Sequence, residues 1–118
     1  MKLMTKEIEK KLIKQGNETL KDPEKDWGKK HKPYLKLFGG GSCTWLISEY
    51  DVESNMFFGL CDLGLGTPEF GYVSKSELES IKFPPFNLPI ERDLLWKPTK
   101  NMWDYWEEAQ KQGSILNI

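Results

Sequence analysis

The sequence is poor in the residues that stabilise a fold through disulfide bonds or bound metal ions. It has 2 cysteines and 1 histidine among 118 residues, too few for a disulfide framework or a zinc cluster. It contains no run of about 18 apolar residues, the length that a membrane-spanning helix needs. The segment Met1–Lys6 is followed by charge and not by the apolar stretch of a secretory signal. We therefore expect a cytoplasmic protein that binds neither metal nor cofactor and has no membrane partner.

Recognisable catalytic motifs are scarce as well. The glycine run Gly39–Ser42 leads into an expected strand and lacks the lysine of a phosphate-binding loop, which favours a turn. His31 lies among lysines, whose charge disfavours its protonated form, and no motif ties it to a nucleophile. We expect no catalytic residues. An enzyme remains a third hypothesis, which requires residues such as Glu49, Asp51, His31 or Arg92 to meet in one pocket.

The net charge of -1 conceals an uneven distribution along the chain. Residues 1–36 carry 11 lysines against 6 acidic residues, a surplus of five positive charges. The remaining residues carry 6 basic and 12 acidic side chains, and every aromatic residue lies from Trp27 onward. This excludes a uniformly basic nucleic-acid binder. It leaves two interpretations open, a solvated basic helix on an aromatic core or a surface with one basic and one acidic end.

Periodicity and turn residues predict helices at both ends of the chain with short strands between them. The first helix is expected from Thr5, which caps it, to Gln15, with Gly16 ending it. Segment 17–32 is expected to be turn and loop. The strands expected from alternation are 34–38, 43–50, 56–63 and 69–73, with 94–96 as an edge strand. Strands 43–50 and 56–63 should form a hairpin, and Trp45 and Ile47 should share one face with Cys43.

The second half of the chain is punctuated by capping residues and prolines. Ser74–Glu77 is a capping box that starts a short helix, and 87–93 is expected to be a rigid connector. Thr99 is expected to cap a last helix, which Gly113 ends. Its apolar face carries Met102, Tyr105, Trp106 and Ala109. The fold class is α+β, with a small, mostly antiparallel β-sheet flanked by an N-terminal helix, a short middle helix and a C-terminal helix. We expect a single domain over 1–118, with 99–118 as an appended helix and tail.

Two groups of residues are candidates for binding a protein partner. Glu49, Asp51 and Glu53 follow one another at the end of a strand and in the turn after it, where three acids are more often simply solvated. In the last helix, Trp103, Trp106 and Glu107 combine aromatic anchors with negative charge. Self-packing is the default for that helix, and a homodimer or a partner groove is the alternative.

Two further clusters have competing interpretations. The segment with Lys29, Lys30, Lys32 and Lys36 interleaves lysines with aromatic residues, a pattern that predicts salt-dependent nucleic-acid binding. The other cluster is Glu91–Asp93, which contains Arg92, the only arginine. We expect Arg92 to form a structural ion pair with Glu91 and Asp93 that fixes the connector; an anion or partner contact is the alternative.

With these segments placed, the chain resembles a family of small uncharacterised proteins that carries a domain-of-unknown-function label. Its members are typically encoded on plasmids, prophages and integrative conjugative elements. The resemblance extends from the first helix through Lys97 and is most specific in the run Leu88–Asp93. The other residues that carry it are 34–38, Thr44–Trp45, Glu49, 57–60, 69–72 and 76–78. The glycine run, the lysine-rich loop and the helix after Pro98 look like departures or additions.

The resemblance implies a genetic setting but supplies no catalytic residues. Small acidic or bipolar proteins of mobile elements in bacteria often act on host defence, as anti-restriction and anti-CRISPR proteins do. The leading hypothesis is a non-enzymatic inhibitor that binds a defence nuclease or its complex, where acidic side chains compete with nucleic acid for a basic channel. The alternative is a nucleic-acid-binding accessory protein that uses segment 29–36.

Overall fold

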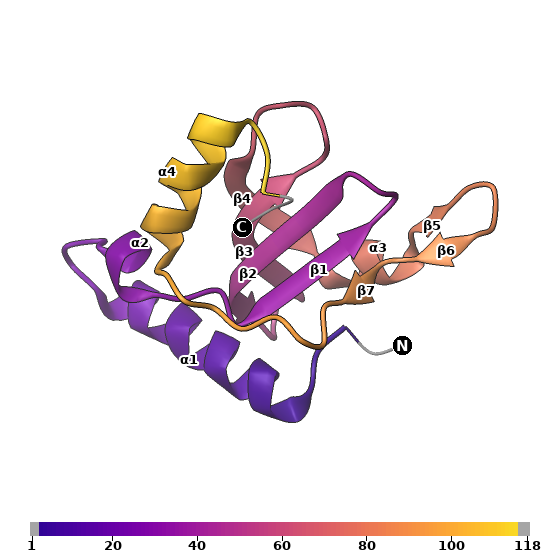
Figure 1. Cartoon of the computed structure of the whole chain (residues 1–118). Coiled ribbons are helices and arrows are strands. Elements are labelled where there is room, and N and C mark those ends of the chain that lie inside the picture. Colours follow the sequence, from indigo (N-terminus) through magenta and orange to yellow (C-terminus); the bar gives the residue numbers. More distant parts are fainter. Residues whose placement is uncertain (1–2, 116–118) are drawn as a thin grey trace.

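A computed structural model describes residues 3–115 of the chain and shows an α+β fold, as the sequence predicts (Figure 1). Five strands form an antiparallel sheet in the order β4-β3-β2-β1-β7, and β5 and β6 form a separate ribbon that projects from one side. The strands are β1 Leu35–Gly39, β2 Cys43–Asp51, β3 Met56–Asp62, β4 Glu69–Ser74, β5 Lys82–Phe83, β6 Leu88–Pro89 and β7 Glu91–Arg92. The helices are α1 Lys6–Lys21, α2 Trp27–Lys30, α3 Lys75–Ser80 and α4 Met102–Gln112.

The first helix begins where the sequence predicts and ends later. The Thr5 hydroxyl accepts the amide of Ile8, which confirms the cap. The helix then passes through Gly16 and ends at Lys21, so the expected stop and the expected turn after it were wrong. A glycine ends a helix only where the backbone turns left-handed, and here the packing of α1 against β2 keeps it helical. The expected loop up to Lys32 likewise contains the single turn α2.

A β-bulge in β2 decides which way the end of that strand faces. The register between β2 and β3 shifts between Ile47 and Glu49, so the alternation of side chains changes phase at Ser48. Trp45 and Ile47 share one face, as expected, and Tyr50 joins them on it instead of Glu49. Glu49 is thereby released from the core face and lines the surface between β2 and α1.

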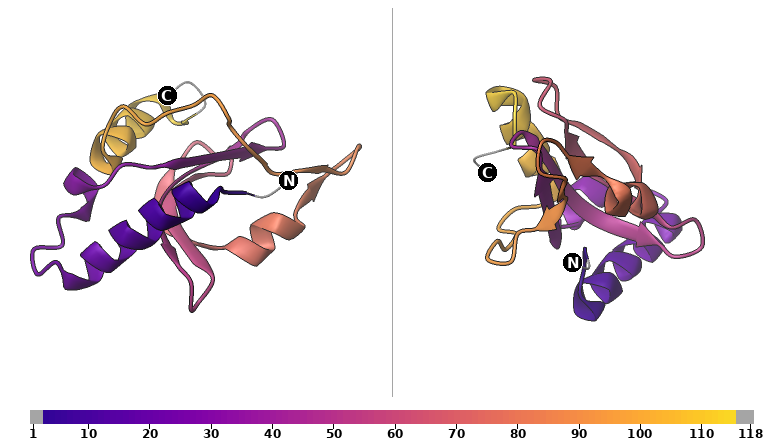
Figure 2. Two further views of the ribbon diagram at one scale, coloured as in Figure 1. Left: turned by 90° about the horizontal axis from the view of Figure 1, so that it is seen from below. Right: turned by 90° about the vertical axis from the view of Figure 1, so that its right-hand side faces the viewer.

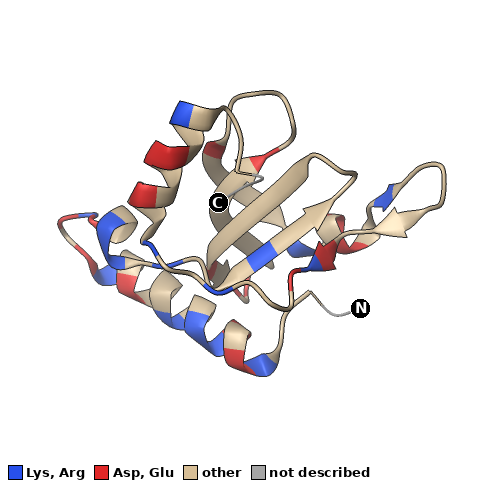
Figure 3. Cartoon of the chain, viewed as in Figure 1, with Lys and Arg blue, Asp and Glu red and all other residues tan. Residues whose placement is uncertain are grey.

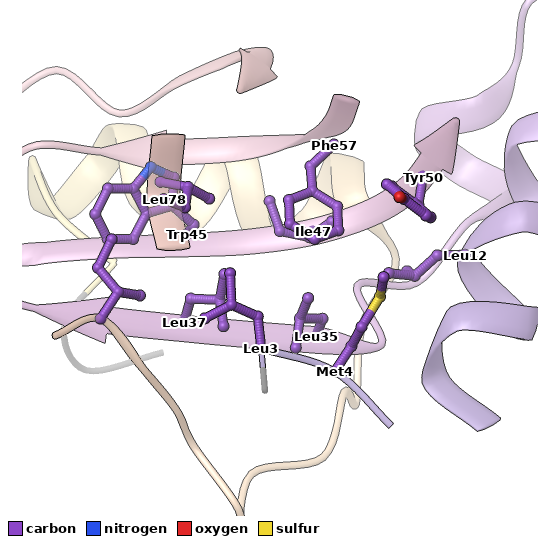
Figure 4. Packing of buried hydrophobic residues seen from close by; sticks show 11 residues of the cluster. Leu3, Met4, Leu12, Leu35, Leu37, Trp45, Ile47, Tyr50, Phe57 and Leu78 are labelled. Carbon is purple, nitrogen blue, oxygen red and sulfur yellow. The ribbon is translucent and has the colours of Figure 1, made fainter. Parts of the chain in front are cut away.

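Two apolar clusters hold the sheet to its helices. The first, drawn in Figure 4, includes Leu12 of α1 with Leu35, Leu37, Trp45, Ile47, Tyr50 and Phe57 of the sheet. The second joins Leu46 and Leu60 to Met102, Tyr105 and Ala109 of α4. Because neighbouring residues of a strand point to opposite faces, Leu46 and Ile47 reach different clusters. The right-hand view of Figure 2 accordingly shows strands between α1 and α4.

The last helix packs through the face that the sequence predicts, but a different residue forms its N-cap. Met102, Tyr105 and Ala109 are buried, and Gly113 ends the helix in a left-handed conformation with φ 73°. The N-cap is Asn101, whose side chain accepts the amide of Asp104, so the expectation for Thr99 was wrong. The amide of Thr99 instead donates to the hydroxyl oxygen of Tyr105 at 3.0 Å.

The edge of the sheet next to β1 is formed by a different segment from the one expected. Glu91 and Arg92 pair with β1 as β7, and β6 also lies in what was expected to be a connector. The expected strand 94–96 is not formed. Asp93 is the reason, because its carboxylate accepts the amides of Leu95 and Trp96 and bends the chain away from β1.

No helix within residues 3–115 has both the length and the apolar character needed to cross a bilayer.

Candidate functional site

A groove of about 410 Å³ lies between α1 and the hairpin of β2 and β3. Its charged lining residues are Glu49, Asp51 and Glu53, the three acids that the sequence singled out, and we call it the acidic groove. Its other lining residues are Ile13, Gly16, Asn17, Leu20, Tyr50, Val52, Met56, Phe58 and Tyr72. The structure therefore brings the three acids together with an apolar surface.

Glu49 is the acid that the protein holds in place. Its side chain is only 12% exposed, and its Oε2 accepts a hydrogen bond from the Thr19 hydroxyl at 2.9 Å. The same oxygen lies 3.5 Å from Nδ1 of His31. A half-buried carboxylate with two fixed neighbours loses little side-chain entropy when a cation binds it. In contrast, Asp51 at the end of β2 and Glu53 in the turn after it are exposed.

His31 lies behind Glu49, with two carboxylates as its nearest charged neighbours. The residue is 2% exposed, and its Nε2 lies 3.5 Å from Oε2 of Glu18. The expectation that lysines set its surroundings was therefore wrong, because adjacent lysine side chains point to solvent while the ring turns inward. The main chain of His31 also accepts the amide of Met102 at 2.9 Å, which ties this position to the start of α4.

Gln15 fastens α1 to the bulge in β2. Its amide nitrogen donates to the carbonyls of Lys32 and Ser48 at 2.9 and 2.6 Å, and its oxygen accepts the amide of Lys32 at 3.2 Å. The bulged residue is thus held by a buried side chain that satisfies backbone groups. Sequence reasoning missed this role, since a glutamine in a helix gives no local signal of a partner 33 residues away.

The rim of the acidic groove carries unusually exposed apolar side chains. Leu20 is 86% exposed, Tyr72 71% and Val52 56%. Apolar residues gathered around a concave surface are typical of interaction sites, whereas scattered ones are ordinary. None of the three was predicted to bind a partner, because they belong to separate segments, α1, the turn after β2 and β4, that meet only in the fold.

A band of aromatic rings connects the acidic groove to α4. Tyr72 and Phe58 have ring centroids 4.9 Å apart, and Phe58 stacks with Phe70 at 6.1 Å. Phe70 stacks with Trp106 at 6.3 Å, and Trp106 stacks with Trp103 at 5.0 Å. The groove and the tryptophans predicted to bind a partner are therefore parts of one continuous surface.

The two tryptophans of this band differ in how much of their surface is exposed. Trp103 is 40% exposed and lies against Gly28 of α2. A Cβ added to Gly28 would be 3.6 Å from the Cβ of Trp103. Trp106 is half-buried against Phe70, so much of its surface supports the fold. Glu107 is exposed beside them.

The four lysines predicted to bind nucleic acid do not form one free cluster. Lys30 pairs with Asp22 at 3.3 Å, and Lys36 pairs with Asp93 at 3.8 Å with its side chain only 13% exposed. Lys29 and Lys32 are exposed. Figure 3 shows mostly lysines with some acidic residues on α1, and mostly acidic residues with one lysine on α4, so the uneven charge of the sequence is only partly separated in the fold.

The Glu91–Asp93 run is divided between two structures. Glu91 and Arg92 lie in β7, while Asp93 pairs with Lys36 and turns the chain. Arg92 and Asp93 line a separate pocket with Tyr34 and Trp96.

The four residues that an enzyme would need to bring together do not meet in one pocket. Glu49 and Asp51 share the acidic groove and His31 lies behind Glu49, whereas Arg92 lines the separate pocket. Among the described residues, no three His, Cys, Asp or Glu side chains are placed to hold a metal ion.

The fold and groove define a small α+β protein with a carboxylate-lined groove. The chain belongs to the family described as protein of unknown function DUF2958, whose profile matches residues 3–116. That match continues past Lys97, where the resemblance seen in the sequence stopped, and includes α4. Comparisons with curated proteins and with solved structures gave no match.

Proposed function

We propose that this protein is a non-enzymatic interaction protein that binds a basic surface of another protein through the acidic groove. The observation that carries the proposal is the arrangement of Glu49, Asp51 and Glu53 around an apolar surface. A partner segment with lysine or arginine beside an apolar side chain complements both features. Charge complementarity of this kind steers association and selects partners.

The partner class follows from the genetic setting that the resemblance implies. We propose that the protein belongs to a mobile genetic element, on a plasmid or in a phage, and inhibits a host-defence nuclease of the CRISPR or restriction type in the bacterial cytoplasm. Such nucleases hold nucleic acid in basic channels, because phosphate contacts supply most of their affinity. A carboxylate-lined groove with an adjoining aromatic band offers negative charge and ring surfaces, which are also the features that a nucleic acid offers.

The establishment of foreign DNA in cells tests this proposal. Plasmid uptake and phage plating are measured in cells that carry one defined CRISPR or restriction nuclease, with and without the protein. The wild-type protein should raise establishment at least about tenfold against one nuclease class, because a bound inhibitor lowers the active fraction in proportion. The Asp51→Lys/Glu53→Lys variant should lose this effect.

A matched variant controls for net charge. Glu7→Lys/Glu24→Lys makes the same change in charge at two exposed acids outside the groove and should remain active. Equal loss in both double variants would contradict a role for the groove. Failure of the wild-type protein against every nuclease in the panel would overturn the proposed function.

The nucleic-acid alternative keeps one supporting observation. Lys29 and Lys30 lie on α2, whose Gly28 contacts the exposed Trp103, so positive charge adjoins a ring on which a base can stack. Fluorescence anisotropy with single-stranded and duplex oligonucleotides at two salt concentrations decides between the functions. Salt-sensitive binding that Lys29→Glu/Lys32→Glu abolishes would establish the alternative, and its absence at low salt would exclude it.

A further inference from the structure

The two edges of the sheet differ in how they are protected. β7 is two residues long, consists of Glu91 and Arg92 and follows a β6 that ends in proline. Short length, charge and proline are the usual means by which proteins prevent pairing at a sheet edge. β4 at the other edge spans six residues, and no described element pairs with its outer side.

The middle of β4, after the charged Glu69, also lacks the features that discourage pairing. Its register with β3 is continuous from Glu69 to Ser74, so no bulge twists it away from a neighbour. Segment 70–73, of sequence Phe-Gly-Tyr-Val, contains no proline and no charge. Tyr72 is 71% exposed. An edge of this kind is a template for a further strand.

We propose that the outer edge of β4 binds β4 of a second copy of this chain, antiparallel and centred on Gly71. In this register, two directly opposed residues lie equally far from position 71, one before it and the other after it. Gly71 faces Gly71 of the second copy, Tyr72 faces its Phe70, and Glu69 faces its Val73. The two five-stranded sheets become one continuous sheet across the two-fold axis.

The side chains of β4 suit this register. Each Tyr72 pairs with a phenylalanine on the face that already carries Phe58 and Trp106, and cross-strand aromatic pairs stabilise antiparallel sheets. The two Glu69 carboxylates face valines and not each other, so like charges are not opposed. Nothing lies within 4 Å of a Cβ built on Gly71, so no side chain crowds the sheet face at the centre of the pairing. The net charge of -1 adds almost no repulsion between copies.

The pairing has a consequence for the acidic groove. Tyr72 lines the groove, and Phe70 of the second copy would lie beside it and extend its apolar wall. The dimer would carry two grooves related by the two-fold axis, which allows bivalent binding to a symmetric partner. The pairing itself rests on the sheet edge alone, so a monomeric protein would leave the groove proposal standing.

Light scattering coupled to gel filtration tests the dimer. The chain mass is 13.8 kDa, and the proposal expects twice that mass at about 100 μM with a decline on dilution, as for an interface of micromolar affinity. Tyr72→Lys should give a monomer, because it removes the aromatic pair and charges the edge. Leu95→Lys, at a site 93% exposed in the loop after β7, should remain dimeric. A wild-type monomer at every concentration would overturn the proposal.

A cysteine at the two-fold centre tests the register. Opposed Cα atoms in antiparallel strands lie about 4.5–5.5 Å apart, which a disulfide spans. Mild oxidation of Gly71→Cys should therefore produce a covalent dimer that the parent protein, with its own Cys43 and Cys61, does not produce. Glu69→Cys, which faces Val73 of the second copy, should not cross-link. Equal cross-linking of both variants, or a dimer lost in Trp103→Ala and retained in Tyr72→Lys, would contradict pairing through β4.

Discussion

Ile47 and Gly59 are register partners at the step before the β2 bulge, and their backbones lie unusually close. A Cβ built on Gly59 would be 2.8 Å from the Cα of Ile47 and would overlap the carbonyl oxygen of Leu46. Only glycine permits this approach. The bulge that follows turns Glu49 out of the core face and into the acidic groove, so Gly59 has a structural link to the candidate site.

Gly59→Ala should therefore destabilise the fold strongly. We expect a loss of about 3 kcal/mol or more in the free energy of unfolding, because the β2 backbone must move to admit a methyl group. Chemical denaturation measures the change. Gly71→Ala is the matched control, because Gly71 pairs with Gly59 across β3 and β4 and has open space around it. Equal effects in the two variants would contradict the close approach.

Gly16→Ala should stabilise the protein. Gly16 is helical in α1, and an added Cβ would make ordinary contacts of 3.6 Å with the Tyr50 carbonyl oxygen and 3.7 Å with the Glu49 Cβ. Alanine loses less backbone entropy than glycine in a helix, by about 0.5–1 kcal/mol. A rise in the midpoint of denaturation checks this. A fall would mean that α1 is more tightly packed on β2 than these contacts indicate.

Asp62→Ala should loosen the segment after α4. Asp62 is 1% exposed, and its two oxygens accept the amides of Gly64 at 2.8 Å and Ile115 at 3.0 Å. Removing a buried carboxylate that accepts two amides should cost about 2 kcal/mol. Hydrogen exchange gives the location of the effect, with faster exchange expected at Ile115 and unchanged exchange in α1. Uniform loss of protection across the chain would contradict a local anchor.

Cys61 should be a slow nucleophile in the folded protein. Burial raises the pKa of its thiol from 9.0 to about 11. At pH 8 the thiolate fraction is then about 100-fold lower than in an unfolded chain, and the thiolate is the species that reacts. Alkylation by iodoacetamide, followed by peptide mass spectrometry with and without urea, measures the ratio. Similar rates in the two conditions would show that the thiol is accessible.

Local patterns predicted much of the fold, and long-range contacts account for the rest. The hairpin of β2 and β3, the capping by Ser74 and the apolar face of α4 depend on neighbours in sequence, and each was predicted correctly. The continuation of α1 past Gly16 and the bulge at Ser48 depend on α1 packing against β2. No periodicity within a short window contains that information.

The candidate site shows the same division. The acids of the turn were visible in the sequence because charge clusters are local. The support of Glu49 by Thr19 and His31 comes from separate segments and became visible only in the fold. The apolar rim was missed because Leu20 and Tyr72 belong to different elements that meet only at the groove.

Binding of a basic partner surface by the acidic groove can be measured with purified proteins. Calorimetry with the purified nuclease identified by the establishment assay gives the affinity of the wild-type protein and the two double variants. We expect Asp51→Lys/Glu53→Lys to weaken binding at least about tenfold and Glu7→Lys/Glu24→Lys to bind like the wild-type protein. Equal affinities for all three proteins would contradict binding through the acidic groove.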